Sequence, residues 1–507
     1  MSAPALRLSA IDKRFGPVHA NRSVDLSVAK GSIHGIVGEN GAGKSTLMGI
    51  VYGYYHADSG AIEVDGAERR IAAPHDAITA GIGMVHQHFM LVENFTVLEN
   101  VLLGAEGGAL LAKGRAHARA ELERLAREYG LEVDLDAKIE DLHVGAQQRV
   151  EILKALYRGA RILILDEPTA VLTPQEADKL FELLALWREQ GRTVVLITHK
   201  LREILAITDR VTVMRQGAVV ATRETKDTSR EELAELMVGR RVTMRVSKGA
   251  SAPGAEVLRV GNLTCVDARG TERLRDVSFA VRAGEIVGVA GVSGNGQTEL
   301  LEALAGLRAV SAGRIVYKGE TLPAPGDPVR AKQARARATA HVPEDRHRMG
   351  MVISFPAYET AILGYHDDSA LAEGPLLSEA RALGRCGKLM CAFDVRPANP
   401  RLKSGKFSGG NQQKIVLGRE IDRDPDLLLV GQPTRGVDIG AIEFIHRRLV
   451  ELRDRGKAVL LVSCELDEIL SLADRILTIC DGRIVGEVEG ASADERRIGL
   501  MMAGIAA

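Results

Sequence analysis

One stretch decides the fold of this chain: Gly38-Glu-Asn-Gly-Ala-Gly-Lys-Ser45. It follows the apolar run Ile33–Val37, which predicts a buried strand, and precedes Thr46-Leu-Met-Gly-Ile50, which predicts the start of a helix. A glycine-rich turn here can wrap its backbone N–H groups around phosphates, and the helix N-terminus adds a favourable dipole. The pattern GxxxxGK[ST] therefore predicts a phosphate-binding loop. The residues expected to contact a nucleotide are Gly38, Asn40, Gly41, Gly43, Lys44, Ser45 and Thr46.

Two adjacent carboxylates follow another apolar strand. Asp166 and Glu167 come directly after the run Arg161–Leu165. We expect Asp166 to hold Mg²⁺, usually through water, together with Ser45, and Glu167 to polarise the attacking water as general base. A solvated pair of surface carboxylates is the ordinary alternative. The position of the pair behind a phosphate loop favours the hydrolytic site.

Three further side chains extend this predicted site. His199 follows the apolar strand Val194–Thr198 and is expected to contact the γ-phosphate and steady the water. Gln87 follows Ile82–Val85 and is expected to reach Mg²⁺ and the same water. Phe15 is placed to stack on adenine, although a lone aromatic residue is more often part of a core. The predicted catalytic residues are therefore Glu167, His199 and Gln87. With them, the first half carries a complete set of groups for ATP hydrolysis.

The chain repeats itself. The segment Val24–Gly38 recurs as Val277–Gly291, an offset of 253, and Asp166–Thr169 aligns with Gly431–Thr434, an offset of 265. Offsets this steady indicate a duplicated domain. Each copy alternates predicted strands and helices, which favours an α/β fold with a largely parallel sheet.

The domain limits follow from the repeat. The join is rich in Gly, Ser, Ala and Pro, as a linker should be, and is predicted at 246–256. The two domains are therefore expected at 1–245 and 257–507. Within them, Leu110–Tyr129 and Leu376–Phe393 are mostly helical in pattern and are expected to form inserted helical subdomains.

The second copy has lost most of the chemical groups. Gln297 stands where the first copy has its lysine, Gly431 and Gln432 replace the two carboxylates, and Cys464 replaces the histidine. Neither glycine nor glutamine can act as a base or hold a metal strongly, so this site is expected not to hydrolyse ATP. The residues left to hold nucleotide there are Gly291, Gly294, Gly296, Gln297, Thr298 and Gln432, with Glu344 in place of Gln87.

Composition sets further limits. A chain of 507 residues is too long for one compact core. Its net charge of −1 gives no global basic surface for nucleic acid. No run approaches the roughly 20 apolar residues of a membrane span, so we expect any membrane role to come through a partner. The five cysteines form no CxxC pair and are interpreted as reduced thiols of a cytoplasmic protein.

These motifs resemble those of the ABC ATPases over nearly the whole chain. The resemblance implies two tandem P-loop ATPase domains, each with a parallel-sheet core, an antiparallel β subdomain and a helical subdomain. In this family, a signature from the opposite domain closes each nucleotide site. Phe407-Ser-Gly-Gly-Asn-Gln-Gln-Lys414 looks like that signature, so Ser408, Gly409 and Gly410 are expected to bind the γ-phosphate of the first site. The other signature, Leu142-His-Val-Gly-Ala-Gln147, keeps only Gly145, with His143 where a serine is expected.

Among ABC proteins, the chain most resembles the nucleoside branch of the bacterial sugar-type importer ATPases. The resemblance rests on His88–Asn100, Gln432–Gly440 and Ala441–Arg448. It implies ATP and Mg²⁺ as cofactors, and two integral membrane permease subunits and an extracytoplasmic substrate-binding lipoprotein as partners. It also implies no nucleic acid and a peripheral place on the cytoplasmic face of the inner membrane. A ribose-, galactose- or xylose-type importer is the alternative. A soluble, non-transport ABC ATPase fits less well, because the linker is short and neutral.

Overall fold

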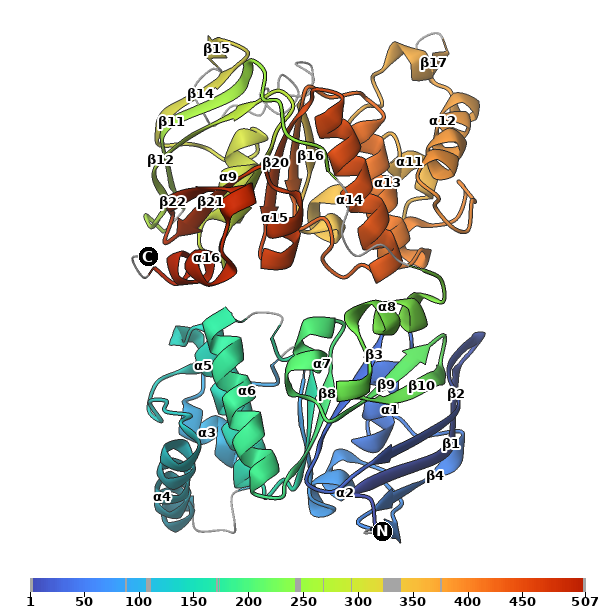
Figure 1. Cartoon of the computed structure of the whole chain (residues 1–507), viewed down its shortest axis with the longest axis vertical. Helices are drawn as coiled ribbons and strands as arrows, with labels where there is room; N and C mark the ends of the chain where they lie inside the picture. Colours follow the sequence, from blue (N-terminus) through green and yellow to red (C-terminus); the bar gives the residue numbers. More distant parts are fainter. Residues whose placement is uncertain are drawn as a thin grey trace. The chain divides into compact units, whose positions relative to one another are not determined.

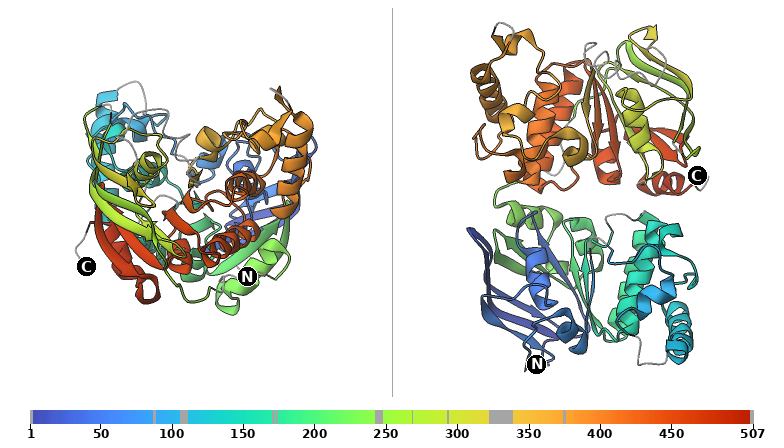
Figure 2. Two further views of the ribbon diagram at one scale, coloured as in Figure 1. Left: turned by 90° about the horizontal axis from the view of Figure 1, so that it is seen from above. Right: turned by 180° about the vertical axis from the view of Figure 1, so that it is seen from behind.

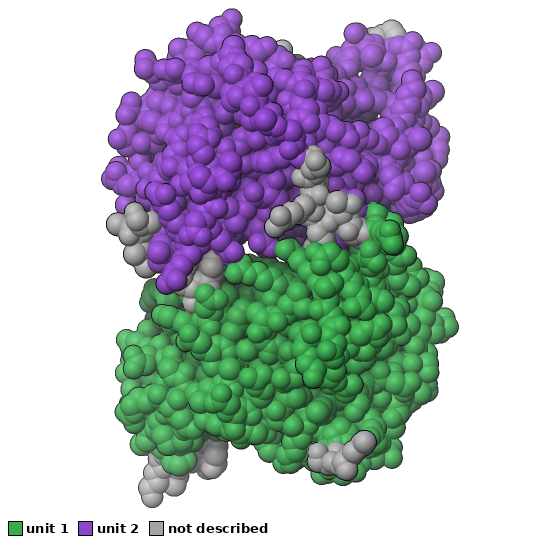
Figure 3. Space-filling view, viewed as in Figure 1, with its two compact units in different colours: residues 1–242 green, residues 243–507 purple. Residues whose placement is uncertain are grey.

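The chain forms two compact units, residues 1–242 and 243–507, in a computed structural model (Figure 3). The structure describes residues 3–86, 89–105, 111–169, 172, 174–241, 248–267, 269–292, 294–321, 339–373 and 376–504. The finer limits expected above, a first domain ending at 245 and a linker over 246–256, stay predictions.

Two sheets build the first unit. Its strands are β1 (Leu6–Phe15), β2 (Val18–Val28), β3 (Ile33–Gly38), β4 (Ser59–Val64), β5 (Ala67–Glu68), β6 (Ile82–Val85), β7 (Ile162–Asp166), β8 (Thr193–Ile197), β9 (Arg210–Arg215) and β10 (Ala218–Glu224). One sheet has the order β10-β9-β3-β8-β7-β6 and is parallel except at the β9–β10 pair. The other, β2-β1-β4-β5, is antiparallel. Strands β3, β7 and β8 are buried along their whole length, which explains their continuous apolar runs.

The first unit also contains α-helices. They are α1 (Lys44–Val51), α2 (Pro74–Thr79), α3 (Val97–Leu102), α4 (Leu111–Tyr129), α5 (Val144–Tyr157), α6 (Pro174–Glu189), α7 (Leu201–Ile207) and α8 (Arg230–Val238). Figure 1 shows α3, α4 and α5 gathered on the side of the unit away from β1, β2 and β4. The helical pattern expected over Leu110–Tyr129 is confirmed by α4.

The second unit repeats this architecture. Its strands are β11 (Glu256–Val266), β12 (Glu272–Arg282), β13 (Ile286–Ala290), β14 (Ala312–Tyr317), β15 (Glu320–Thr321), β16 (Thr339–Val342), β17 (Ala372–Glu373), β18 (Leu376–Leu377), β19 (Leu427–Gly431), β20 (Ala458–Ser463), β21 (Arg475–Cys480) and β22 (Arg483–Glu489). The mostly parallel sheet runs β16-β19-β20-β13-β21-β22 and the antiparallel one runs β12-β11-β14-β15. The predicted fold of two α/β domains, each with a parallel core and an antiparallel sheet, is thus confirmed.

The second unit likewise contains α-helices. They are α9 (Gln297–Leu304), α11 (Ala357–Thr360), α12 (Glu379–Ala392), α13 (Gly409–Ile421), α14 (Ile439–Asp454), α15 (Leu466–Leu472) and α16 (Glu495–Met502). The right view in Figure 2 shows the orange helical part and the yellow-green antiparallel sheet at opposite sides of this unit. The helix predicted over Leu376–Phe393 begins later than expected, because Leu376–Leu377 pairs with Ala372–Glu373 as a short strand. Among the described residues, no helix is both long and apolar enough to cross a membrane.

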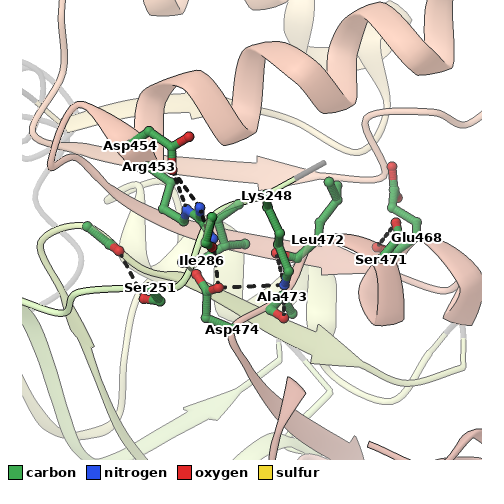
Figure 4. Close-up of polar contacts among 12 residues, drawn as sticks. Lys248, Ser251, Ile286, Arg453, Asp454, Glu468, Ser471, Leu472, Ala473 and Asp474 are labelled. Carbon is green, nitrogen blue, oxygen red and sulfur yellow. Dashed lines mark hydrogen bonds and ion pairs between the residues drawn. The ribbon is translucent and has the colours of Figure 1, made fainter. Parts of the chain in front are cut away.

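The chain that enters the second unit is tied to its surface (Figure 4). Lys248 Nζ donates to the carbonyl oxygens of Leu472 at 3.1 Å and Ala473 at 2.6 Å, and lies 3.5 Å from Asp474 Oδ1. Arg453 Nη1 donates to Asp474 Oδ1 at 2.9 Å, and its Nη2 donates to Gly249 O at 3.0 Å. Residues 248–255 therefore form a strap that lies on the second unit.

The duplication supplies a comparison for this strap. In the first unit, the matching pair is Arg188 and Asp209, with Nη1 and Oδ1 3.0 Å apart. Those side chains are 36% and 38% exposed, whereas the side chains of Arg453 and Asp474 are 1% and 10% exposed. The same Arg–Asp pair is thus open in one unit and covered in the other.

Candidate functional site

The first phosphate loop lies between β3 and α1, as predicted. Gly41 and Gly43 have φ angles of 82° and 95°, in the left-handed region that favours glycine. A Cβ on Gly43 would lie 2.2 Å from the carbonyl oxygen of Ala20, and one on Gly38 would lie 2.4 Å from that of Met214. Both distances are far inside van der Waals contact, so packing requires glycine at positions 38 and 43, whereas backbone conformation favours it at positions 41 and 43.

Lys44 begins α1 and turns back over the loop. Its Nζ donates to Gly38 O at 2.7 Å and to Glu39 O at 3.1 Å. Burial lowers the pKa of Lys44, although the nearby carboxylates of Glu167 and Asp166 act in the opposite direction. The ammonium group is therefore held within the loop, where a triphosphate would be cradled.

Asp166 ends β7 beside the phosphate loop. Its side chain hydrogen-bonds Ser45, and burial raises the pKa of the carboxyl despite that bond. A hydroxyl and a carboxylate from facing elements are oxygen donors of the kind that Mg²⁺ uses with substrate phosphates and water. The two residues therefore fit the metal role predicted for them.

Glu167 and His199 form a hydrogen-bonded pair next to these groups. Glu167 has φ +50°, and its backbone N–H donates to Ile197 O at 2.8 Å. His199 Nδ1 lies 2.8 Å from Glu167 Oε1. Burial acts to raise the pKa of Glu167, but the histidine bond and nearby positive charges, Lys44 among them, outweigh it and lower that pKa. The carboxylate is thus kept ionised and oriented, as a general base must be.

Two further residues were predicted for this site, Phe15 and Gln87. Phe15 ends β1 and is 42% exposed, so it is not part of the core. The Tyr55 ring meets it edge-on with centroids 5.2 Å apart, a contact that no sequence pattern indicates. Gln87 lies outside the described residues, so its catalytic and metal roles stay predictions.

The second phosphate loop has the same backbone but different chemistry. Gly294 and Gly296 have φ angles of 93° and 102°, and Gln297 begins α9. Gln297 is buried, and its Nε2 lies 3.9 Å from Cys464 Sγ. The amide thus takes the place of the ammonium without its charge. Thr298 Oγ1 donates to Glu344 Oε2 at 2.5 Å.

The residue matching the general base is also matched in conformation. Gln432 has φ +45°, and its N–H donates to Val462 O at 2.8 Å. Its Nε2 donates to Cys464 Sγ at 3.0 Å, and its Oε1 accepts from Cys464 N–H at 3.2 Å. The Gln432–Cys464 pair therefore occupies the positions of Glu167 and His199 without a carboxylate.

Both predicted signatures lie at helix starts. Ser408 is the N-cap residue of α13, and Asn411 Nδ2 donates to its Oγ at 2.8 Å. His143 caps α5, accepting from the Ala146 N–H at Nδ1 with a separation of 3.3 Å. A Cβ on Gly145 would lie 2.4 Å from Glu176 Oε1. The role of each signature at the site of the other unit stays a prediction.

One contact of the signature region was missed at the level of sequence. Arg346 Nη1 donates to Arg435 O at 2.8 Å, and Arg346 Nε donates to Gln412 Oε1 at 3.3 Å. Its position two residues after Glu344 was visible, but partners 66 and 89 residues away in the chain are not readable from spacing.

Comparison with known proteins agrees with this geometry. The family described as ABC transporter matches residues 21–170 and 274–435, one segment in each unit. The chain is 47% identical to the guanosine import ATP-binding protein NupO of Bacillus subtilis, over 97% of this chain and 96% of that protein. It is 46% identical to the nucleoside import ATP-binding protein NupA of Lactococcus lactis, over 98% of each chain. It is also 46% identical to the glucose import ATP-binding protein TsgD13 of Haloferax volcanii, over 99% of this chain and 96% of that protein.

The expectations of two tandem domains and of ATPase activity are therefore confirmed, since the family matches both units and the import relatives align over nearly the whole chain. ABC proteins of this kind bind and hydrolyse ATP. The chain belongs to the ABC transporter family and is an ATPase with two tandem nucleotide-binding domains.

Proposed function

We propose that this chain is the ATP-hydrolysing subunit of a nucleoside importer. The observation that carries the proposal is its near-full-length similarity to two import ATP-binding proteins named for guanosine and for nucleosides. The glucose importer relative, at almost the same identity, keeps a sugar as the second candidate substrate. The motifs His88–Asn100 and Gln432–Gly440 favour the nucleoside branch.

The first unit supplies the chemistry in this proposal. Lys44 neutralises the phosphates, and Glu167, oriented by His199, takes a proton from the attacking water. Ser45 and Asp166 would hold Mg²⁺, which supplies charge neutralisation on the phosphates when it is bound. Phosphoryl transfer depends on positioned charge, and these residues supply the charged groups of one working site.

The second unit contributes differently. Its site offers Gln297, Gln432 and Cys464, so the positions that match Lys44, Glu167 and His199 carry neither the ammonium, the carboxylate nor the imidazole. Its signature, Ser408 to Gly410, completes the first site in the proposal, with the Ser408 hydroxyl and the α13 N-terminus binding the γ-phosphate. The chain therefore has one hydrolytic site and one silent site.

Partners and location follow from the importer role. Two integral membrane permease subunits would receive the motion of this chain, and a substrate-binding lipoprotein outside the membrane would deliver the nucleoside. The ATPase itself would sit at the cytoplasmic face of the membrane as a peripheral subunit. ATP drives transport if it binds the closed form of the chain more tightly than the open form.

An uptake experiment tests the substrate. Deleting this chain in its host should abolish high-affinity uptake of radiolabelled guanosine and other nucleosides, and the wild-type gene should restore it. Uptake of glucose and ribose, measured in the same cells, is the matched control. Intact nucleoside uptake with collapsed uptake of one sugar would transfer the proposal to the sugar importers.

A second experiment tests the composite site. Ser408→Ala removes a hydroxyl from an exposed N-cap and should lower ATP turnover of the assembled transporter by about 10-fold, the worth of one charge-assisted hydrogen bond. His143→Ala is the matched change in the other signature and should have little effect on turnover. Gly409→Asp, a bulkier probe, is less informative, since a Cβ at Gly409 would lie only 2.6 Å from Gly436 O of its own unit. Equal effects of the two alanine variants would contradict the asymmetry.

A further inference from the structure

The signature of the second unit is braced by an arginine from a neighbouring loop. Arg346 begins η3 (Arg346–Gly350), a single π-helical turn that follows β16. Its Nη2 lies 2.9 Å from the point where a Cβ on Gly409 would be, so the guanidinium packs against the backbone of the signature. Through Nη1 it also binds the carbonyl of Arg435, in the loop after β19. One side chain thus joins two loops that border the signature.

A glutamine in the signature helix completes this brace. Gln412 Oε1 accepts from Arg346 Nε at 3.3 Å and lies 2.8 Å from His347 Nε2. Gln412 Nε2 donates to Ser404 O at 3.2 Å, and the residue is only 5% exposed. The first turn of α13 is therefore fixed from both sides, by the segment before it and by the loop that carries Arg346.

The first unit shows which part of this arrangement is special. Both units tie the loop after the strand to the signature helix: Lys154 Nζ donates to Met90 O at 2.9 Å, and Arg419 Nη1 donates to Gly350 O at 2.8 Å. Glu344 aligns with Gln87 at an offset of 257. At the same offset the counterpart of Arg346 is Phe89, whose side chain has no charge and no hydrogen-bond donor. The arginine brace thus accompanies the intact signature and not the altered one.

We propose that Arg346 is a positioning residue for ATP hydrolysis at the first site. It holds Ser408 to Gly410 in the conformation that binds the γ-phosphate, and it sets a positive charge beside the Gly409 backbone. This inference rests on the proposed function, in which the second signature completes the first site. A misplacement of about 1 Å in such a group costs on the order of 100-fold in rate, so the brace matters for turnover more than for ATP capture.

The same loop connects the brace to the silent site. Glu344, two residues before Arg346, accepts a hydrogen bond from Thr298 of the second phosphate loop. Burial raises the pKa of Glu344, and the Thr298 bond only partly opposes this shift. Any change at the silent site that moves Glu344 would therefore reach the signature through a single intervening residue, Asp345.

The test compares three variants of the full chain in its assembled transporter. Arg346→Gln removes the charge and the planar fork, whereas Arg346→Lys keeps the charge and loses the fork. Arg401→Gln is the matched control, because Arg401 is an exposed arginine shortly before the signature whose ion pair with Glu379 is at the surface. Each variant is assayed for kcat per bound ATP, KM for ATP, and thermal unfolding midpoint, with bound ATP counted by titration of a fluorescent analogue.

The expected result is a selective loss of turnover. Arg346→Gln should lower kcat per bound ATP by about 10- to 100-fold with KM within about threefold of wild type, Arg346→Lys should recover part of the loss, and Arg401→Gln should match wild type. Counting bound ATP removes any fraction that fails to fold. Turnover of Arg346→Gln within twofold of wild type, or an equal loss in Arg401→Gln, would overturn the inference.

The Ser408→Ala variant separates this inference from the function beneath it. If Ser408→Ala loses turnover and Arg346→Gln does not, the result supports the completion of the first site by the second signature and contradicts the positioning role of Arg346. If Ser408→Ala keeps full turnover, the second signature does not serve the first site, and the composite-site proposal fails first.

Discussion

Replacing Glu167 by glutamine isolates the chemical step at the first site. The second unit already carries glutamine at the matching position: Gln432 has φ +45°, against +50° for Glu167, and each residue bonds the strand before the histidine or cysteine position. Glu167→Gln should therefore fold without a backbone change. The amide oxygen can still accept the 2.8 Å bond from His199, so the geometry of the pair should also persist.

What the substitution removes is the proton acceptor. A positioned general base is worth about 10²- to 10⁴-fold in rate, which corresponds to about 3 to 5 kcal/mol of barrier. Because His199 and Lys44 already keep the carboxylate ionised at neutral pH, the wild-type base is fully available, and we expect a loss near the middle of this range, about 10³-fold. ATP affinity should be unchanged or higher, since a negative charge beside the phosphates disappears.

The assay is steady-state phosphate release by the assembled transporter, with ATP affinity measured by a fluorescent analogue on the same sample. Glu176→Gln, a carboxylate on α6 outside the proposed proton path, is the matched control and should hydrolyse ATP within about twofold of wild type. Turnover of Glu167→Gln within 10-fold of wild type, with intact ATP binding, would refute the assignment of the base.

Three further predictions concern the loops and the core. Lys44→Ala should abolish measurable hydrolysis while Gln297→Ala keeps most of it, and equal losses in phosphate-release assays would contradict one working site. Gly43→Ala should weaken ATP binding more than 10-fold, because its Cβ would lie 2.2 Å from Ala20 O, and an unchanged Kd would show that the loop can rearrange. Burial lowers the pKa of His34 to about 4, against 6.5 for the free side chain. Between pH 6.5 and pH 4 only the unfolded chain takes up a proton at this histidine, so the free energy of unfolding falls as the pH drops through that range. At pH 5 the loss in free energy of unfolding should be about 2 kcal/mol. The variant His34→Gln cannot take up that proton, so its stability, measured by urea unfolding, should depend correspondingly less on pH. Identical pH dependence of stability in the variant and the wild type would contradict this prediction.

The sequence was sufficient for the fold because the informative signals are local. The pattern of the phosphate loop lies within the consecutive residues 38–45, although packing against Ala20 and Met214 also requires two of its glycines, and the buried strands appear as apolar runs. Because the chain is duplicated, each motif occurs twice, and alignment of the two copies shows that Gln432 and Cys464 replace Glu167 and His199. What these signals identify is the set of elements and the residues at strand ends.

The contacts that orient those residues were not readable in the same way. The edge-on packing of Tyr55 on Phe15 and the bonds of Arg346 join positions 40 to 89 residues apart, and neither follows a periodic pattern. The short strand at Leu376–Leu377 was missed because two leucines before a helical segment fit either structure, and pairing with Ala372–Glu373 decided between them.

The strap over Arg453 and Asp474 has a consequence for the tether between the units. With Lys248 bonded to the second unit, roughly nine residues of chain separate the end of α8 from this attachment point. Release of residues 248–255 from the surface would about double the number of connecting residues. Each doubling of a flexible connection costs about 0.6 kcal/mol of closure entropy, or roughly threefold in the effective concentration of one unit around the other. By holding residues 248–255 on the surface of the second unit, the strap keeps these residues from adding to the length of chain that joins the two units.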